Sequence, residues 1–135
     1  MITIATLLHL QDELRNFSKE KLSLGLKYKL EIYFEELKKR TTPIETQRVA
    51  RIKELSNGGN NIPQEIEGQA NPVFDQFVKE YQELLESPTE LPSMDKFIHL
   101  DVISSIETNN TYPLIFKHLV YELEKVAPVE SVPTN

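Results

Sequence analysis

Cysteine is absent from this chain, and its absence removes several kinds of chemistry at once. A disulfide scaffold, a thiolate nucleophile and a zinc site with cysteine ligands all need that residue, so none of them is possible. No segment approaches the roughly 20 apolar residues that cross a membrane as one helix. The amino terminus has no basic residue before its apolar ones, so we do not interpret it as a signal peptide. We expect a cytoplasmic protein that does not bind membranes.

Positive charge is scarce in the second half of the chain. Residues 57–135 carry 4 Lys or Arg against 13 Asp or Glu, whereas residues 1–56 carry 11 against 8. Nucleic-acid affinity comes largely from neutralised phosphates, so the acidic half argues against a nucleic-acid partner. The one basic run, Lys38-Lys39-Arg40, follows two glutamates and is better explained as a solvated helix face.

The strongest pattern in the chain lies between Ser18 and Leu55 and predicts a long helix. Apolar residues recur there at steps of three and four, which is the spacing of one helical face. These residues are Leu22, Leu26, Leu30, Tyr33 and Leu37, with a second line of Leu24, Tyr28 and Ile32 beside them. The combined apolar surface is wider than one partner helix needs, so we expect this helix to pack on two sides.

A first, shorter helix is predicted for residues 4–17, with Thr3 or Thr6 able to cap its start. Ser18 then has the position of an N-cap for the long helix, which would make the two helices an antiparallel hairpin. Gly25 inside the long helix suggests close approach of a neighbouring helix, although a late helix start near Leu24 would also explain it.

Pro43 leaves two alternatives for the long helix. The sequence from Thr42 to Glu45 reads as a capping box with proline at the first helical position, which would begin a new helix. The apolar spacing nevertheless continues through Ile44 and Ile52. We favour a long helix that is kinked or briefly interrupted at Thr41–Pro43.

The remaining chain alternates between loops and short elements. Residues 57–70 predict a long polar loop with a short extended piece at 61–63, and a loop of that length is usually functional or mobile. Asn71-Pro72 predicts the cap and first residue of a helix that ends before Ser87-Pro88. The change of period at 97–100 predicts a short edge strand, paired with residues near 89–91.

Two helical pieces and a tail complete the prediction. Asp101 is expected to cap a single turn over 102–106, and a last helix is expected to begin at Thr111–Pro113 and continue to Val126. The tail 127–135 has two prolines, one charge and no periodicity, so we predict disorder there.

Residues that could carry catalysis or hold a metal do not cluster in the sequence. His9, His99 and His118 lie in three separate elements, and the pair His118/Glu122 has no second pair spaced to complete a metal site. Ser104-Ser105 lacks the flanking glycines of a nucleophile elbow, and Gly58-Gly59 does not match a phosphate-binding loop. We therefore predict no catalytic residue, no metal and no cofactor.

Aromatic residues concentrate on the long helix and on the helix after Pro72, where core packing explains most of them. Some of them, Tyr28 and Phe34 especially, could instead anchor a partner from the second face of the long helix. We predict a protein interface made of Leu24, Tyr28, Ile32 and Phe34, because an apolar helix face in a small domain is commonly buried in an assembly.

The order of elements resembles a set of small tailed-phage proteins of uncharacterised function. The resemblance is carried by the leucine-patterned first helix, the long helix beginning Leu-Gly-Leu-Lys-Tyr-Lys-Leu, the Gly/Asn turn before Ile-Pro, and the Phe-x-x-Phe…Glu-Leu-Leu helix. It covers residues 4–125 and has no motif that carries a site across. It implies a phage or prophage origin and a non-enzymatic role.

The sequence therefore predicts a mainly α fold in one domain over residues 1–126. We expect a helical hairpin with a long second helix, two further helices and a minimal β element. The predicted function is a non-catalytic interaction or structural subunit, in a homo-oligomer or a multi-subunit assembly, in the host cytoplasm or the virion. The alternative is a small acidic inhibitor or regulator of a host enzyme or nucleic-acid-binding factor, whose basic groove the carboxylates of the second half could occupy.

Overall fold

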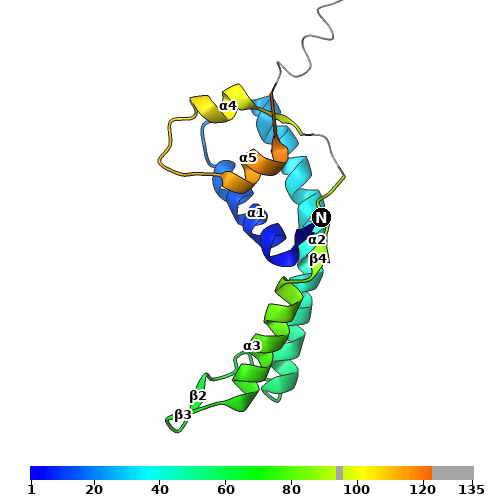
Figure 1. Cartoon of the computed structure of the whole chain (residues 1–135), viewed down its shortest axis with the longest axis vertical. Coiled ribbons are helices and arrows are strands. Elements are labelled where there is room, and N and C mark those ends of the chain that lie inside the picture. The colour runs from blue at the N-terminus through cyan, green and yellow to red at the C-terminus, as the bar shows by residue number, and fades with distance from the viewer. Residues whose placement is uncertain (94–95, 123–135) are drawn as a thin grey trace, which may run out of the picture. The chain divides into compact units, whose positions relative to one another are not determined.

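The computed structural model describes residues 1–93 and 96–122, and these residues are mainly helical (Figure 1). The predicted fold class, with its long second helix and small β elements, is confirmed. The chain forms two compact units, which we call unit 1 (Met1–Leu8 and Glu36–Leu91) and unit 2 (His9–Glu35 and Pro92–Asn135). The tail predicted for 127–135 lies outside the described residues.

The first helix, α1, spans Ile4–Phe17, as the apolar spacing predicts. Of the two candidate caps, Thr3 has the capping role, because its hydroxyl oxygen accepts the backbone N–H of Thr6 at 3.2 Å. The two residues before α1 form the strand β1, Ile2–Thr3, which pairs antiparallel with β4, Pro88–Thr89. Unit 1 therefore ties the start of α1 to the chain that follows its last helix.

The long helix, α2, spans Leu24–Leu55 and begins later than Ser18 predicts. The Ser18 N–H still bonds to the Leu14 carbonyl at 2.9 Å, so Ser18 ends α1 and cannot open α2. Ser23 is the residue whose side chain caps α2, accepting the Leu26 N–H at 3.2 Å. A Cβ built on Gly25 would meet nothing within 4 Å, so close approach of a neighbouring helix does not explain this glycine. The start of α2 at Leu24 places it in the first turn, as the other explanation predicted.

Helix α2 continues through Pro43, so neither an interruption nor a new helix occurs there. Pro43 is exposed, and a proline in a helix interior removes one backbone hydrogen bond. Two residues earlier, Thr41 is buried, and its hydroxyl donates to the Lys38 carbonyl at 3.3 Å. The apolar spacing that continues beyond Leu37 predicted this continuity better than the capping-box motif did.

The long loop predicted for 57–70 contains a β-hairpin, which the sequence analysis missed. Asn57 and Gly58 have positive φ and end α2, and the Gly58 N–H bonds to the Lys53 carbonyl at 2.7 Å. The hairpin pairs β2, Glu65–Ile66, with β3, Gln69–Ala70, and no strand forms at 61–63. Glu67 and Gly68 both have positive φ, which is the requirement of a tight two-residue hairpin turn.

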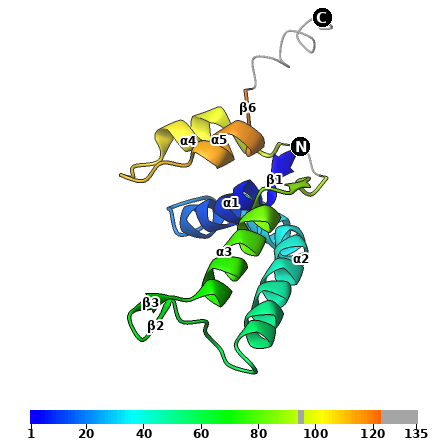
Figure 2. The same ribbon diagram turned by 60° about the horizontal axis from the view of Figure 1, so that its bottom comes forward.

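Helix α3, Pro72–Leu85, follows the hairpin and has the predicted bounds. Asn71 caps it as predicted, with its side-chain oxygen accepting the Val73 N–H at 3.0 Å. The Asn71 amide nitrogen also donates to the Pro63 carbonyl at 2.8 Å, which holds the loop against the helix start. Helix α3 runs antiparallel to the second part of α2 (Figures 1 and 2).

The carboxy-terminal elements of unit 2 differ from their predictions in partner and length. Strand β5, Ile98–His99, forms where predicted, but it pairs in parallel with β6, Val120–Tyr121, and not with residues near 89–91. Helix α5, Pro113–Leu119, therefore ends well before Val126, because the chain extends to make that pair.

Helix α4, Leu100–Ser105, begins two residues earlier than an Asp101 cap would allow. The cap is His99, whose Nδ1 accepts the Asp101 N–H at 2.9 Å. The His99 ring also meets the Tyr121 ring edge-on, at 5.2 Å between centroids. This histidine therefore has a structural role at the junction of β5 and α4.

Candidate interaction surface

The predicted interface residues on α2 form one exposed apolar line in unit 2. The side chains of Leu24, Tyr28 and Ile32 are 85%, 67% and 39% exposed, respectively. A helix turns by about 100° per residue, so residues four apart drift by only about 40° and lie in one stripe. Within the same segment Leu30 and Tyr33 are buried. We call Leu24, Tyr28 and Ile32 the α2 stripe.

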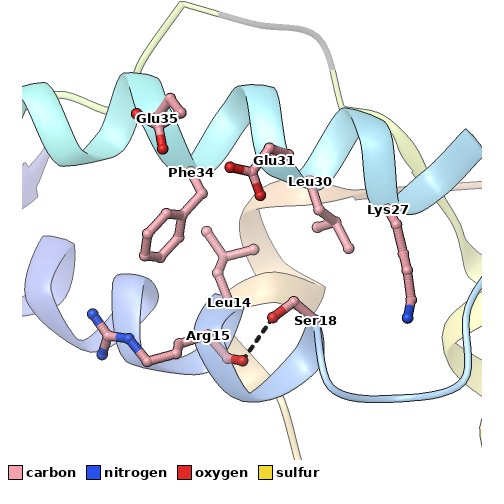
Figure 3. A pocket seen from close by; sticks show the side chains of 8 residues that line it. All are labelled: Leu14, Arg15, Ser18, Lys27, Leu30, Glu31, Phe34 and Glu35. Carbon is pink, nitrogen blue, oxygen red and sulfur yellow. Dashed lines mark hydrogen bonds between the residues drawn. The ribbon is translucent and has the colours of Figure 1, made fainter. Parts of the chain in front are cut away.

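Phe34, the fourth predicted residue, is not part of this stripe. It is half-buried and lines a hollow of about 400 Å³ between α1 and α2, with Leu14 and Leu30 contributing the other apolar walls (Figure 3). The guanidinium of Arg15 lies 5.7 Å from the centre of the Phe34 ring, within the range of a cation–π contact. The structure thus separates the four predicted residues into a stripe of three and an aromatic in a neighbouring groove, which we call the α1–α2 groove.

Charged side chains border the α1–α2 groove and separate it from the stripe. Figure 3 shows Phe34 and Leu30 directed from α2 toward α1, with Glu31 and Glu35 on the adjoining side of α2. By helical position, Glu31 and Glu35 stand between Phe34 and the line of Leu24 and Tyr28. Among the described residues neither carboxylate has a hydrogen bond or ion pair. The surface therefore combines an apolar stripe, two unpaired carboxylates and an aromatic groove.

Two carboxylates, one on α1 and one just after it, join this part of unit 2 to the chain around α5. The Glu13 carboxylate accepts the backbone N–H groups of Leu114 and Ile115 at 3.0 and 3.1 Å, so a side chain of α1 caps the start of α5. No side chain of its own caps α5, because Tyr112 at that position makes no such bond. The role of Glu13 was not predicted from the sequence, since about a hundred residues separate it from its partners.

Glu20 makes the second carboxylate contact. It accepts the Tyr112 hydroxyl proton and a bond from the Asn110 amide at 3.4 Å. The hydrogen bond from the Tyr112 hydroxyl lowers the pKa of Glu20 most, and a smaller lowering comes from Thr108. Burial and the hydrogen bond to Glu20 raise the pKa of Tyr112. The Tyr112 ring packs edge-on against Phe17 at 5.1 Å between centroids. These contacts join the end of α1 to the chain before α5.

The histidines do not assemble into a catalytic or metal-binding group. His9 is exposed, His99 caps α4, and His118 lies in the last turn of α5, where burial and the nearby Lys117 and Lys96 lower its pKa. Within residues 1–93 and 96–122, no group of three or more His, Asp or Glu side chains is placed to hold a metal ion. In the same part of the chain, no helix combines the length and apolarity needed to cross a bilayer.

Comparison with known proteins gives no relative for this chain. No family model, curated protein or solved structure matches it.

Proposed function

We propose that this protein is a non-catalytic interaction subunit that binds another protein through the α2 stripe, and that it is phage-encoded, as the resemblance in element order implies. The observation that supports the proposal is the exposure of Leu24, Tyr28 and Ile32 in one line. Scattered exposed apolar residues are ordinary on a protein surface, whereas three aligned ones that include a tyrosine are typical of an interface. The host cytoplasm or the virion is the proposed location.

The α2 stripe is too small to form a stable interface without the residues beside it. The stripe spans eight residue steps of helix and is therefore only about 12 Å long. Stable interfaces bury about 1,200–2,000 Å², which is more than the stripe alone can supply. The adjoining Glu31 and Glu35 and the aromatic groove supply further contact area. We therefore propose a partner with an apolar ridge for the stripe and a basic side chain that meets the two carboxylates.

The test is a charge substitution in the stripe, Tyr28→Asp with Ile32→Asp. Both side chains are exposed, so the fold is expected to persist while a buried carboxylate at the interface abolishes binding. The tagged wild-type and double-variant proteins are used for affinity capture from the native cell, with mass spectrometry at low and high salt. Phe116→Asp is the matched control, because Phe116 is another exposed aromatic of unit 2 that lies on α5.

The expected result is a set of proteins recovered at fixed ratio with wild type and with Phe116→Asp, at either salt concentration, and lost with the double variant. Circular dichroism and the urea unfolding midpoint should match wild type. Recovery of the same proteins by the correctly folded double variant would show that the stripe is not the interface.

A second function is favoured by the charge of the chain after α2. The side chains of Glu65, Glu67 and Asp75 are all exposed, around the β2–β3 hairpin and the first turn of α3. An acidic inhibitor or regulator would place such carboxylates in a basic groove of a host protein. In the same capture experiment it predicts a single host protein whose recovery falls steeply with salt and is unaffected by the stripe substitutions.

A further inference from the structure

Unit 1 contains a helical hairpin whose apolar side chains are incompletely covered. The hairpin consists of α2 from Glu36 to Leu55 and of α3. No residue of α3 is buried, although seven of its fourteen residues are apolar. On α2, no residue after Thr41 is buried. Two helices alone can bury only the seam between them, and an amphipathic helix with a wider apolar face needs another layer.

The contacts within the hairpin identify which sides of the helices face each other. Arg51 makes a bidentate ion pair with Glu80, at 2.7 and 2.9 Å, and Gln76 donates to the same carboxylate at 3.0 Å. The line of α3 that includes Glu80, Leu84 and Phe77 therefore faces α2. A neighbouring line, which includes Phe74 and Val78, is turned to the side of the hairpin.

The apolar residues turned to the side lie on one common face. Val78 on α3 is 47% exposed and Val49 on α2 is 40% exposed. Because the two right-handed helices run antiparallel, the rotation from the seam to Val49 and the rotation from the seam to Val78 lead to the same side. We call this the hairpin face, and it contains Val49, Ile52, Phe74, Val78 and Tyr81. Tyr81 stacks on Phe77 at 5.8 Å between ring centroids, which gives the face a fixed aromatic part.

Charge distinguishes the two helices of the hairpin. Residues 36–55 of α2 carry six Lys or Arg against three Glu, whereas residues 72–86 carry one Lys against four Asp or Glu. Near the turn end of the hairpin, Lys53 on α2 and Asp75 on α3 are both exposed. Neither side chain has a hydrogen bond or ion pair with any described residue. A surface with a basic edge and an acidic edge on either side of an apolar centre is complementary to itself.

We propose that the hairpin face binds a second copy of this chain, forming a two-fold four-helix bundle in which each α2 lies against the α3 of the other copy. The turns of both hairpins lie at the same end, so Lys53 of each copy meets Asp75 of the other. Both surfaces are the same, as closed two-fold pairing requires. A hairpin about 20 Å long and about 20 Å wide offers roughly 400 Å² from each copy, or about 800 Å² in total, which is below the about 1,200–2,000 Å² of stable interfaces and is the size of a weak one. The dimer is therefore concentration-dependent.

The proposal is tested by reversing one charge at a time on the full-length protein. Lys53→Glu alone places two acidic pairs in the dimer, and Asp75→Lys alone places two basic pairs there. Each is expected to weaken self-association about tenfold or more, measured by sedimentation equilibrium. An equimolar mixture of the two variants restores opposite charges at both contacts, so heterodimers should form with nearly the wild-type dissociation constant.

Two further variants separate this surface from the α2 stripe. Val78→Asp is expected to weaken the dimer at least a hundredfold. Each copy contributes one substituted residue, so the dimer would bury two carboxylates in an apolar contact. Tyr28→Asp with Ile32→Asp should leave self-association unchanged, since the inference does not depend on the proposed function. A monomeric wild type at millimolar concentration would overturn the proposal. Failure of the charge-reversed mixture to associate, with both variants folded by circular dichroism, would overturn it equally.

Discussion

Unit 2 buries far more of its apolar side chains than unit 1 does. Of the buried apolar residues in the described chain, ten belong to unit 2 and three to unit 1, namely Leu7, Leu37 and Ile62. The core of unit 2 is drawn from α1, α2, β5, α5 and β6. Unit 1 contains the amphipathic helix α3, yet no residue of α3 is buried.

The two units therefore differ in whether their apolar side chains form a packed interior. Unit 2 has a packed interior, and its α2 stripe is an additional exposed feature on a supported helix. In unit 1 the incomplete burial extends over a whole hairpin, and an amphipathic hairpin gains stability when a further layer covers it. We therefore propose a recognition surface for unit 2 and self-assembly for unit 1.

The largest effect that would sharpen this contrast is expected from a core truncation. Leu10→Ala in unit 2 removes a fully buried side chain and should cost about 2–5 kcal/mol in the free energy of unfolding. Leu84→Ala on α3 removes a half-buried leucine and should cost roughly 1 kcal/mol. Urea unfolding of both variants at one protein concentration is the measurement. Equal losses would show that burial does not distinguish the two units.

A smaller effect is expected from the cap of α3 in unit 1. Asn71 is buried and both accepts the Val73 N–H and donates to the Pro63 carbonyl. Asn71→Ala removes both bonds and should cost about 1–2 kcal/mol, whereas Asn71→Ser keeps a capping oxygen and should recover part of that loss. Thermal unfolding compares the two. If alanine and serine destabilise equally, the cap is not the important contact.

Local signals in the sequence predicted helices α1 and α3 well, whereas the predicted caps Ser18 and Asp101 were wrong. The bounds of α1 and α3 and the cap Asn71 follow from apolar spacing and from the Asn-Pro pair, which act within a few residues. The predicted line of Leu24, Tyr28 and Ile32 is exposed, as an interface requires, because one helical face is read directly from spacing. Phe34 lies outside this line, since the packing of α1 places its ring in a groove, and its part in an interface stays a prediction.

The features that the sequence did not predict depend on distant residues. The pairing of β5 with β6 and the capping of α5 by Glu13 join segments that lie far apart in the chain. The β2–β3 hairpin is the exception, because Gly68 gave a local signal for a turn that was read only as part of a loop. The sequence also did not predict that the hairpin face is exposed, because the apolar pattern of α3 is that of an ordinary core helix.

The smallest expected effect is a pH dependence in unit 2. The Tyr112 hydroxyl lowers the pKa of Glu20 below 4.5, so this contact contributes stability above pH 4.5 that is lost as the pH falls through the lowered value. The raised pKa of Tyr112 contributes stability below pH 10 that is lost as the pH rises through the raised value. Glu20→Gln should therefore lower the urea midpoint at pH 7, with the difference from wild type closing as the pH falls below 4.5.

Unit 1 supplies the comparison for this measurement. Hydrogen bonds from Arg51 and, to a smaller extent, from Gln76 lower the pKa of Glu80 to about 2. The Arg51–Glu80 contact therefore persists to more acidic pH than an ordinary carboxylate would allow. Glu80→Gln should keep most of its difference from wild type at pH 4, which is well above the pKa of Glu80. Tyrosine fluorescence and amide exchange resolved by segment assign each loss to its unit. A Glu20→Gln difference that stays constant from pH 7 to pH 3 would mean that the carboxylate charge does not hold Tyr112.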